Sequence, residues 1–435
     1  MIRLQNEKWC IKISQIILAY FYGFLIIDLV NGFLLNAFND KLPISLGQIV
    51  RGILTSILIF ELVSTKITTK NNRHIFMLLF FAPIFIVLHC LRDGSFNMIS
   101  MGLIALLKPF FFLLLLNQVI INRNYFKAHL NKIMLINLFV YSGSIILSYI
   151  FETGINAYST YYDANKSFFY ASNAIAVIGF TFTIYFTYRL KNKLNNLIYL
   201  ILSIISLFIA GSMIVLIYPL FLLFFITYKV SKQFWYKTLA TSLILITIIL
   251  FLSGTLNSIL FVDNALFLRY QDRALHSINF FDKHSTINIT PLRWYSYVSG
   301  TRAIRANQGL NNIVDEPSAL IIGYGNAMRS LKVGEDYAGK EGSEMDFIDI
   351  FLDYGLIGFL LIYFPILKII SHLIYKINTN MNAIIIYFIF IYSCLAGHVM
   401  TAPMGAALFA LFLGLATDQH HLKNNYPIIT NYQFK

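Results

Sequence analysis

Charged residues are scarce in this sequence. Asp, Glu, Lys and Arg make up 12% of its 435 residues, whereas hydrophobic residues make up 58%. An ordinary soluble domain uses about 25% charged residues to cover its surface, so the composition excludes a soluble fold. Long apolar runs recur from Ile13 to Ala416. The sequence predicts an all-α, polytopic membrane protein.

Cysteine is equally rare. Cys10, Cys90 and Cys394 are odd in number, widely spaced, and lie in or beside apolar segments, which excludes a disulfide framework and a cysteine metal site. No other His, Cys and acidic residues have the spacing of metal ligands, and no Ser–His–Asp set can be placed from the sequence. We therefore expect no metal and no cofactor.

The apolar runs predict about twelve transmembrane helices. A bilayer core of about 30 Å requires about 20 apolar residues in helical form. Residues 197–228 are too long for one straight crossing and are interrupted at Gly211-Ser212 and Pro219, so we assign them two crossings. The other predicted spans are residues 13–35, 48–65, 75–91, 98–118, 133–151, 168–188, 238–257, 347–367, 382–398 and 403–417.

The basic residues predict the orientation. With twelve spans, the loops on the side of the two termini hold 19 of the 33 Lys and Arg residues, and the short loops on the other side hold four. Because cytoplasmic loops are enriched in Lys and Arg, both termini are expected in the cytoplasm. This asymmetry also accounts for most of the net charge of +13, and we expect membrane lipids as partners and no nucleic acid.

Residues 258–345 form one long polar segment on the outer side. They divide the chain into spans 1–9 (residues 1–257), the large loop (258–345), and spans 10–12 with a short tail (346–435). Loops of this length in a compact protein are usually functional or disordered. Disorder is not expected here because the loop contains many aromatic and aliphatic residues, Trp294 and Tyr295 among them.

Arginine pairs recur in this loop at helical spacing. Arg269 and Arg273 are four positions apart, Arg302 and Arg305 are three apart, and Arg293 precedes Trp294. Side chains at these spacings share one helix face, and guanidinium groups bind phosphate or carboxylate in a bidentate manner. The alternative interpretation is that they pair with acids of the same loop or with lipid phosphates.

The loop ends in a glycine turn and an acidic cluster. Gly323-Tyr324-Gly325 predicts a tight turn with close backbone approach, and Tyr324 could stack on a sugar ring. Glu344, Asp346, Asp349 and Asp353 gather where the next span begins. Carboxylates are favoured there by the helix dipole, but one of them could also act as a general base beside an arginine-bound anion.

These pieces, in this order, resemble the O-antigen polymerase and O-antigen ligase family. The resemblance rests on Arg293, Arg302 and Arg305, on Gly323-Tyr324-Gly325, on Glu344, and on Tyr354-Gly355-Leu356-Ile357-Gly358. Residues 207–212 also look like a stretch of that family, although Met213 stands in place of its arginine.

The resemblance implies glycan transfer at the outer face of the bacterial inner membrane, without a metal or a nucleotide sugar. The substrate would be an oligosaccharide linked to undecaprenyl pyrophosphate, and a chain-length regulator would be a possible partner. Ligases carry a His where this chain has Glu344, which favours a polymerase of lipid-linked repeat units. A lipid-linked oligosaccharide flippase and an O-antigen ligase are the alternatives, and the large loop and Glu344 respectively argue against them.

The implied chemistry suggests a role for each candidate residue. Negative charge grows on the pyrophosphate as it leaves, and preorganised cations stabilise such charge. We predict this role for Arg293, Arg302 and Arg305, and Glu344 would accept the proton of the attacking hydroxyl, although the identity of the base stays open. The residues predicted to bind substrate or pyrophosphate are Arg269, Arg273, Lys108, Tyr324 and Asp346.

Two further polar residues lie in or near apolar spans. Lys108 precedes Pro109 in the middle of its span, where a charge normally faces protein or water. It is expected either to pair with Asp28 or Glu61 or to bind the lipid diphosphate. His398, at the outer end of its span, is interpreted as an interfacial residue rather than a catalytic one.

Overall fold

A computed structural model of the chain confirms the all-α fold class for the part that it describes. It describes residues 2–38, 44–64, 98–155, 165–169, 171–190, 195–210, 301–325, 343, 345–374, 380–395 and 397–417, together with part of 75–88. These residues are almost entirely helical and contain no β-strand. Four helical stretches are long and apolar enough to cross a membrane: Lys12–Ala37, Leu46–Val63, Arg123–Ile150 and Asp346–Leu373.

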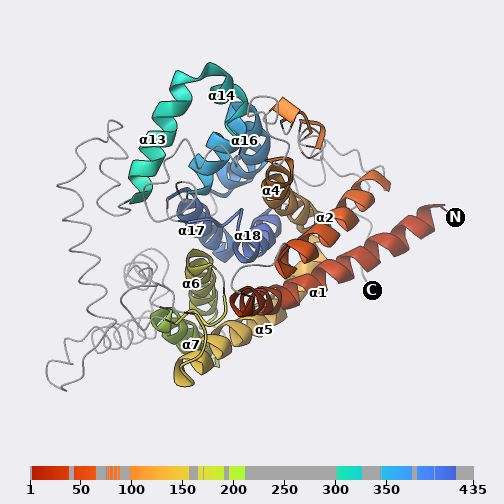
Figure 1. Cartoon of the computed structure of the whole chain (residues 1–435). Helices are drawn as coiled ribbons and strands as arrows, with labels where there is room; N and C mark the ends of the chain where they lie inside the picture. Colours follow the sequence, from red (N-terminus) through yellow and green to blue (C-terminus); the bar gives the residue numbers. More distant parts are fainter. Residues whose placement is uncertain are drawn as a thin grey trace. The chain divides into compact units, whose positions relative to one another are not determined.

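The helices follow the predicted apolar spans closely (Figure 1). Their bounds are α1 Ile2–Ala37, α2 Leu46–Ser64, α4 Met98–Ile121, α5 Arg123–Ile150, α6 Ser172–Arg189, α7 Asn195–Ile209, α13 Thr301–Asp315, α14 Pro317–Ile322, α16 Asp346–Leu373, α17 Met381–Leu395 and α18 Pro403–Ala416. Helix α7 ends just before the predicted interruption at Gly211. The predicted span 238–257 lies outside the described residues.

The chain divides into two compact units. The first contains Met1–Ile27, Pro43–Ile133 and His284–Lys435, and the second contains Asp28–Leu42 and Met134–Lys283. The predicted division at residues 257 and 345 follows the membrane topology and is not tested by these units. The predicted site residues that the structure describes all belong to the first unit, and Asp28, a predicted partner of Lys108, belongs to the second.

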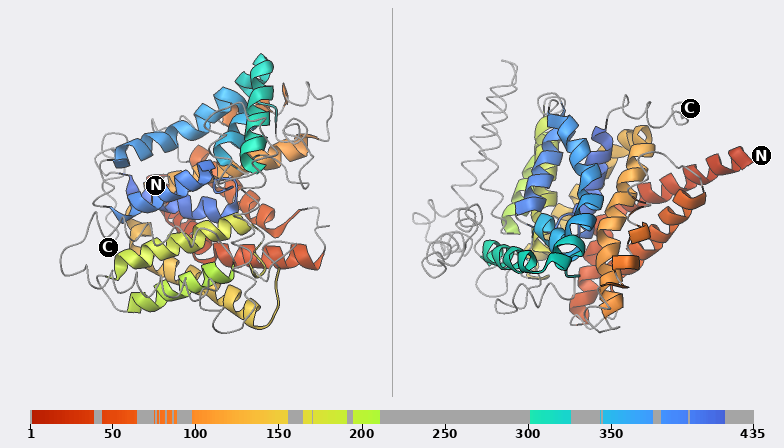
Figure 2. Two further views of the ribbon diagram at one scale, coloured as in Figure 1. Left: turned by 90° about the vertical axis from the view of Figure 1, so that its left-hand side faces the viewer. Right: turned by 90° about the horizontal axis from the view of Figure 1, so that it is seen from above.

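In the first unit, α4 and α18 pack against each other and run in the same direction. The rings of Phe112 and Phe409 stack 5.2 Å apart. At the C-terminal end of α18, a Cβ atom on Gly414 would lie 2.6 Å from Val119 Cγ1, so this glycine allows close packing. Arg123, which begins α5, donates from Nε to the carbonyl oxygen of Leu415 at 2.9 Å. Helices α16, α17 and α18 lie side by side in the same unit (Figure 2).

The regular hydrogen bonding of helix α16 is interrupted at Gly355. The turn Gly323-Tyr324-Gly325 lies against the interruption and supplies hydrogen-bond donors there. Gly355 has φ 60° and ψ −166°, which breaks the helical pattern of hydrogen bonds from each N–H to the carbonyl four positions earlier. The carbonyls of Leu352 and Asp353 instead accept hydrogen bonds from the backbone N–H groups of Tyr324 (2.7 Å) and Gly325 (3.0 Å). The structure therefore shows the turn with close backbone approach that the glycines predicted.

No side chain fits at this crossing. A Cβ atom on Gly323 would lie 2.3 Å from the carbonyl oxygen of Asp353, and one on Gly355 would lie 2.4 Å from the carbonyl carbon of Ile321. Both glycines also have positive φ, at 79° and 60°, a region that is unfavourable for residues with a Cβ atom. The sequence thus requires glycine on both sides of the contact.

In the second unit, α6 packs against α7, and the chain just before α6 contacts the end of α7. A buried contact of 3.1 Å joins the hydroxyl groups of Thr183 and Ser203 across the two helices. Asn165, in the loop before α6, donates from its backbone N–H to the carbonyl of Ile209 at 3.1 Å. The α5–α6 loop therefore lies at the same end of the unit as the C-terminus of α7.

We predict that Gly355→Ala destabilises the protein strongly, because the new methyl group meets backbone atoms that cannot move aside. Overpacking of this kind costs about 1–3 kcal/mol, and the unfavourable φ adds to it. The thermal unfolding midpoint of purified protein in detergent should fall. Gly52→Ala in α2 is the matched control, because nothing lies within 4 Å of the added atom. Equal midpoints for the two variants would contradict the account of the crossing.

Candidate functional site

Four of the predicted site residues lie outside the described residues. These are Arg269, Arg273, Arg293 and Glu344, and their roles stay predictions. The other five (Lys108, Arg302, Arg305, Tyr324 and Asp346) are described, and all but Lys108 lie on α13, on the glycine turn or at the start of α16.

Arg302 and Arg305 lie one turn apart on α13. Arg305 is buried, with 3% of its surface exposed, and Arg302 is partly exposed. The helix packs against α14 and α16 (Figure 1), and its buried Ile313 belongs to the same core cluster as Leu352 of α16. The two predicted anion-binding arginines are therefore carried on a helix that is fixed to the first part of α16.

Tyr324 is fully buried. Its side chain belongs to the core cluster with Ile313, Ala319 and Leu352, and none of its surface is exposed. A sugar platform needs an exposed ring face, so this placement favours a structural role for Tyr324. The ring anchors the glycine turn between α13, α14 and α16.

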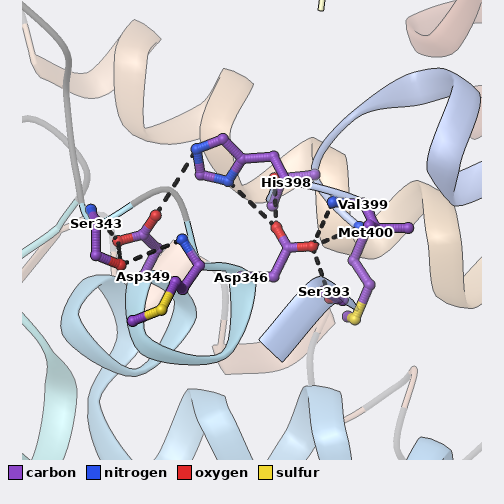
Figure 3. Close-up of polar contacts among 9 residues, drawn as sticks. Ser343, Asp346, Asp349, Ser393, His398, Val399 and Met400 are labelled. Atoms are coloured by element: carbon purple, nitrogen blue, oxygen red, sulfur yellow. Dashed lines mark hydrogen bonds and ion pairs between the residues drawn. The ribbon is translucent and has the colours of Figure 1, made fainter. Parts of the chain in front are cut away.

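Asp346 is buried and accepts hydrogen bonds from several parts of the α17–α18 connection (Figure 3). Its Oδ2 accepts from the Ser393 hydroxyl at 2.8 Å and from the backbone N–H groups of Val399 and Met400 at 2.6 and 2.7 Å. Its Oδ1 accepts from the Thr401 hydroxyl at 2.7 Å. These contacts join the start of α16 to the end of α17 and to the loop that leads into α18.

The hydrogen bonds of Asp346 give this buried carboxylate a structural role. A buried charge is tolerated only when it is hydrogen-bonded on all sides, and here the donors come from segments about 50 residues away. The predicted substrate-binding role of Asp346 is not needed to explain this geometry. Asp346 ties the α17–α18 loop to α16, and its role in substrate binding stays a prediction.

Asp349, one turn further along α16, holds the end of the large loop. Its Oδ1 accepts hydrogen bonds from the backbone N–H and the hydroxyl of Ser343, both at 2.8 Å. Ser343 directly precedes Glu344 in the sequence. The end of the predicted outer loop and the α17–α18 loop are therefore fixed to the same first turns of α16.

His398 lies between the two carboxylates (Figure 3). Its Nδ1 is 3.4 Å from Oδ1 of Asp346, and its Nε2 is 3.8 Å from Oδ2 of Asp349. The side chain of His398 is 35% exposed, whereas those of Asp346 and Asp349 are 0% and 2% exposed. The sequence interpretation of His398 as an interfacial residue missed this contact with two buried acids.

Asp346, Asp349 and His398 together resemble an acid–base site in their chemistry. A buried carboxylate beside one imidazole nitrogen orients the ring, and it stabilises the imidazolium that forms when the other nitrogen takes up a proton. One sequence signal could have identified the site: Ser393 lies inside the apolar helix α17, and His398 and Thr401 lie in the short connection between the apolar helices α17 and α18. Nothing in the sequence alone indicated that Asp346 would be their common partner.

Lys108 lies on α4 directly before Pro109 and is partly buried. Glu61 of α2, one of its predicted partners, accepts a hydrogen bond from the side-chain amide of Gln118 on α4. Asp28, the other, belongs to the second unit. The pairing of Lys108 and its role in diphosphate binding both stay predictions.

Within the described residues, no group of three or more His, Cys, Asp and Glu side chains is arranged to hold a metal ion. Comparisons of the chain with protein-family models, with curated proteins and with solved structures found no match.

We predict that Asp346→Ala destabilises the protein, because it leaves buried N–H groups of Val399 and Met400 without their acceptor. Each buried group left unsatisfied costs about 1–3 kcal/mol. The variant should show a lower membrane level and a lower thermal midpoint in detergent. Asp315→Ala serves as the control, since Asp315 is exposed on α13. A midpoint for Asp346→Ala equal to that of the control would contradict the structural role.

Proposed function

We propose that the protein is a membrane glycosyltransferase that polymerises lipid-linked oligosaccharide repeat units at the outer face of the bacterial cytoplasmic membrane. The observation that carries the proposal is the assembly around the first turns of α16. The arginine helix α13, the turn Gly323-Tyr324-Gly325 and the interruption at Gly355 are the pieces on which the family resemblance rests, and they pack against one another.

The proposed topology has twelve spans with both termini in the cytoplasm. Helix directions within each unit support it. Helices α4 and α18 run in parallel, as two inward spans should. The start of α16 meets the α17–α18 loop, and the α5–α6 loop meets the end of α7. In the proposed topology the outer side holds the start of α16, the α17–α18 loop, the α5–α6 loop and the end of α7.

The proposed reaction joins two lipid-linked glycans. An acceptor hydroxyl attacks C1 of the donor sugar, and the bond from C1 to the undecaprenyl pyrophosphate breaks with its electron pair on the leaving oxygen. Arginines of the loop, Arg302 and Arg305 among them, stabilise this negative charge. Preorganised cations are most effective at a water-poor membrane edge, and the partly exposed Arg302 lies on a helix that is held against α14 and α16.

Reporter fusions test the topology. Fusions after Lys70, Lys193 and Lys376 should report a cytoplasmic location, and fusions after Ser285 and Gly334 should report an outer location, because the basic loops stay inside. The paired use of an enzyme active only outside and one active only inside controls for expression. A cytoplasmic signal after Ser285 would overturn both the topology and the function.

Surface-glycan gels test the function. Deletion of the gene should leave surface glycan with a single repeat unit, because the unit is still made, exported and attached. In the deletion strain, the Arg302→Ala and Arg305→Ala variants should not restore long glycan chains even when the variant protein is present in the membrane at its normal level. The reason is that loss of one stabilising donor lowers rates about 10²–10³-fold.

The control for the gel experiment is Gln308→Ala, an exposed position on the same helix α13, which should restore normal chains. Loss of all surface glycan on deletion would indicate a flippase instead, and polymer retained on the carrier lipid would indicate a ligase. Normal chain length with Arg293→Ala, Arg302→Ala, Arg305→Ala and Glu344→Ala at normal abundance would show that the proposed site is wrong.

A further inference from the structure

We propose that His398, oriented by Asp346, is the general base that accepts the proton of the acceptor hydroxyl. This inference rests on the proposed function and deepens it, because the sequence left the base open and predicted only Glu344. The observation behind it is a partly exposed imidazole held against two buried carboxylates at the start of α16.

The geometry around Asp346 selects the reactive nitrogen of His398. Asp346 is held by Ser393, Thr401 and the backbone of the loop, so its position is fixed. Its Oδ1 faces Nδ1 of His398 at 3.4 Å. A carboxylate in this position favours the tautomer with the proton on Nδ1, which leaves the lone pair on Nε2. Nε2 is then the atom that can take a proton.

The second carboxylate stabilises the product of that proton transfer. Oδ2 of Asp349 lies 3.8 Å from Nε2, too far for a hydrogen bond in this geometry but close enough for a favourable charge interaction. Proton uptake turns His398 into an imidazolium between Asp346 and Asp349. Both acids have almost no exposed surface, so solvent screens this attraction little.

His398 is also the most exposed member of the cluster. Its side chain is 35% exposed, and it lies where the end of the large loop, held through Ser343, meets the α17–α18 loop. In the proposed topology this is the outer face, where the lipid-linked glycans react.

The proposed step balances. As the hydroxyl oxygen of the acceptor sugar bonds to C1 of the donor, its proton passes to Nε2 of His398. The C1–O bond of the donor breaks, and its electron pair leaves with undecaprenyl pyrophosphate. The imidazolium then releases the proton to water, which restores the neutral base for the next transfer.

A purely structural role for His398 predicts different behaviour. Asn at position 398 can still donate a hydrogen bond toward Asp346, but it has no nitrogen that accepts a proton. The matched control is His372→Asn, since His372 is exposed at the other end of α16, where its Nδ1 lies 2.7 Å from the carbonyl oxygen of Lys368.

The test measures the initial rate at which two repeat units are joined. The substrate is the lipid-linked repeat unit extracted from the deletion strain, and the enzyme is the full-length protein in membrane vesicles. H398N should lower the rate about 100-fold or more, the range expected for loss of a general base, with a thermal midpoint within about 2 °C of the wild type. H372N should be unchanged. Added imidazole should partly restore H398A.

The outcomes separate this proposal from the proposed function. If the wild type joins no units, the proposed function fails and the base assignment fails with it. If the wild type is active and H398N keeps its rate within threefold, only the base assignment is overturned, and a loss in Glu344→Gln would then assign the role to Glu344. If H398N does not accumulate, H398Q takes its place. Failure of both to accumulate would assign His398 to the fold and overturn the proposal.

Discussion

The first unit depends on the burial of one carboxylate. Asp346 stands at the start of α16 with no exposed surface, and a charge in that position is stable only when donors surround it. Those donors come from the end of α17 and from the loop before α18. The requirement to satisfy this one side chain therefore fixes where the chain returns after leaving α16, and it brings His398 beside Asp346 and Asp349.

A second constraint acts through the backbone. The interruption of α16 at Gly355 leaves the carbonyls of Leu352 and Asp353 without helical donors, and the N–H groups of the glycine turn donate hydrogen bonds to them. These two hydrogen bonds hold α14 and α13 against α16, and the Tyr324 side chain lies in the core between the helices. The arginine-bearing helix is thus positioned by two hydrogen bonds and an apolar cluster, and the buried carboxylate of Asp346 lies about two turns earlier on α16.

The sequence predicted the helical class and most helix positions, because apolar runs of membrane length have few other outcomes. It also predicted the glycine turn, since only close backbone approach explains Gly323 and Gly325 together. The contacts within the site were harder to predict. Asp346 and His398 are 52 positions apart, and only tertiary packing brings them together. Tyr324 was interpreted as a ligand-facing aromatic, but a tyrosine in a turn can equally well be a core residue, and in the structure it is buried in the core cluster.

We propose that this protein joins lipid-linked glycans at the site around the start of α16. The most direct measurement is mass spectrometry of products formed by purified full-length protein, reconstituted in lipid nanodiscs with the lipid-linked repeat unit as the only glycan. The account predicts carrier-linked products of two, three and more repeat units, together with free undecaprenyl pyrophosphate. If folded protein leaves the repeat unit unchanged, the claim is contradicted.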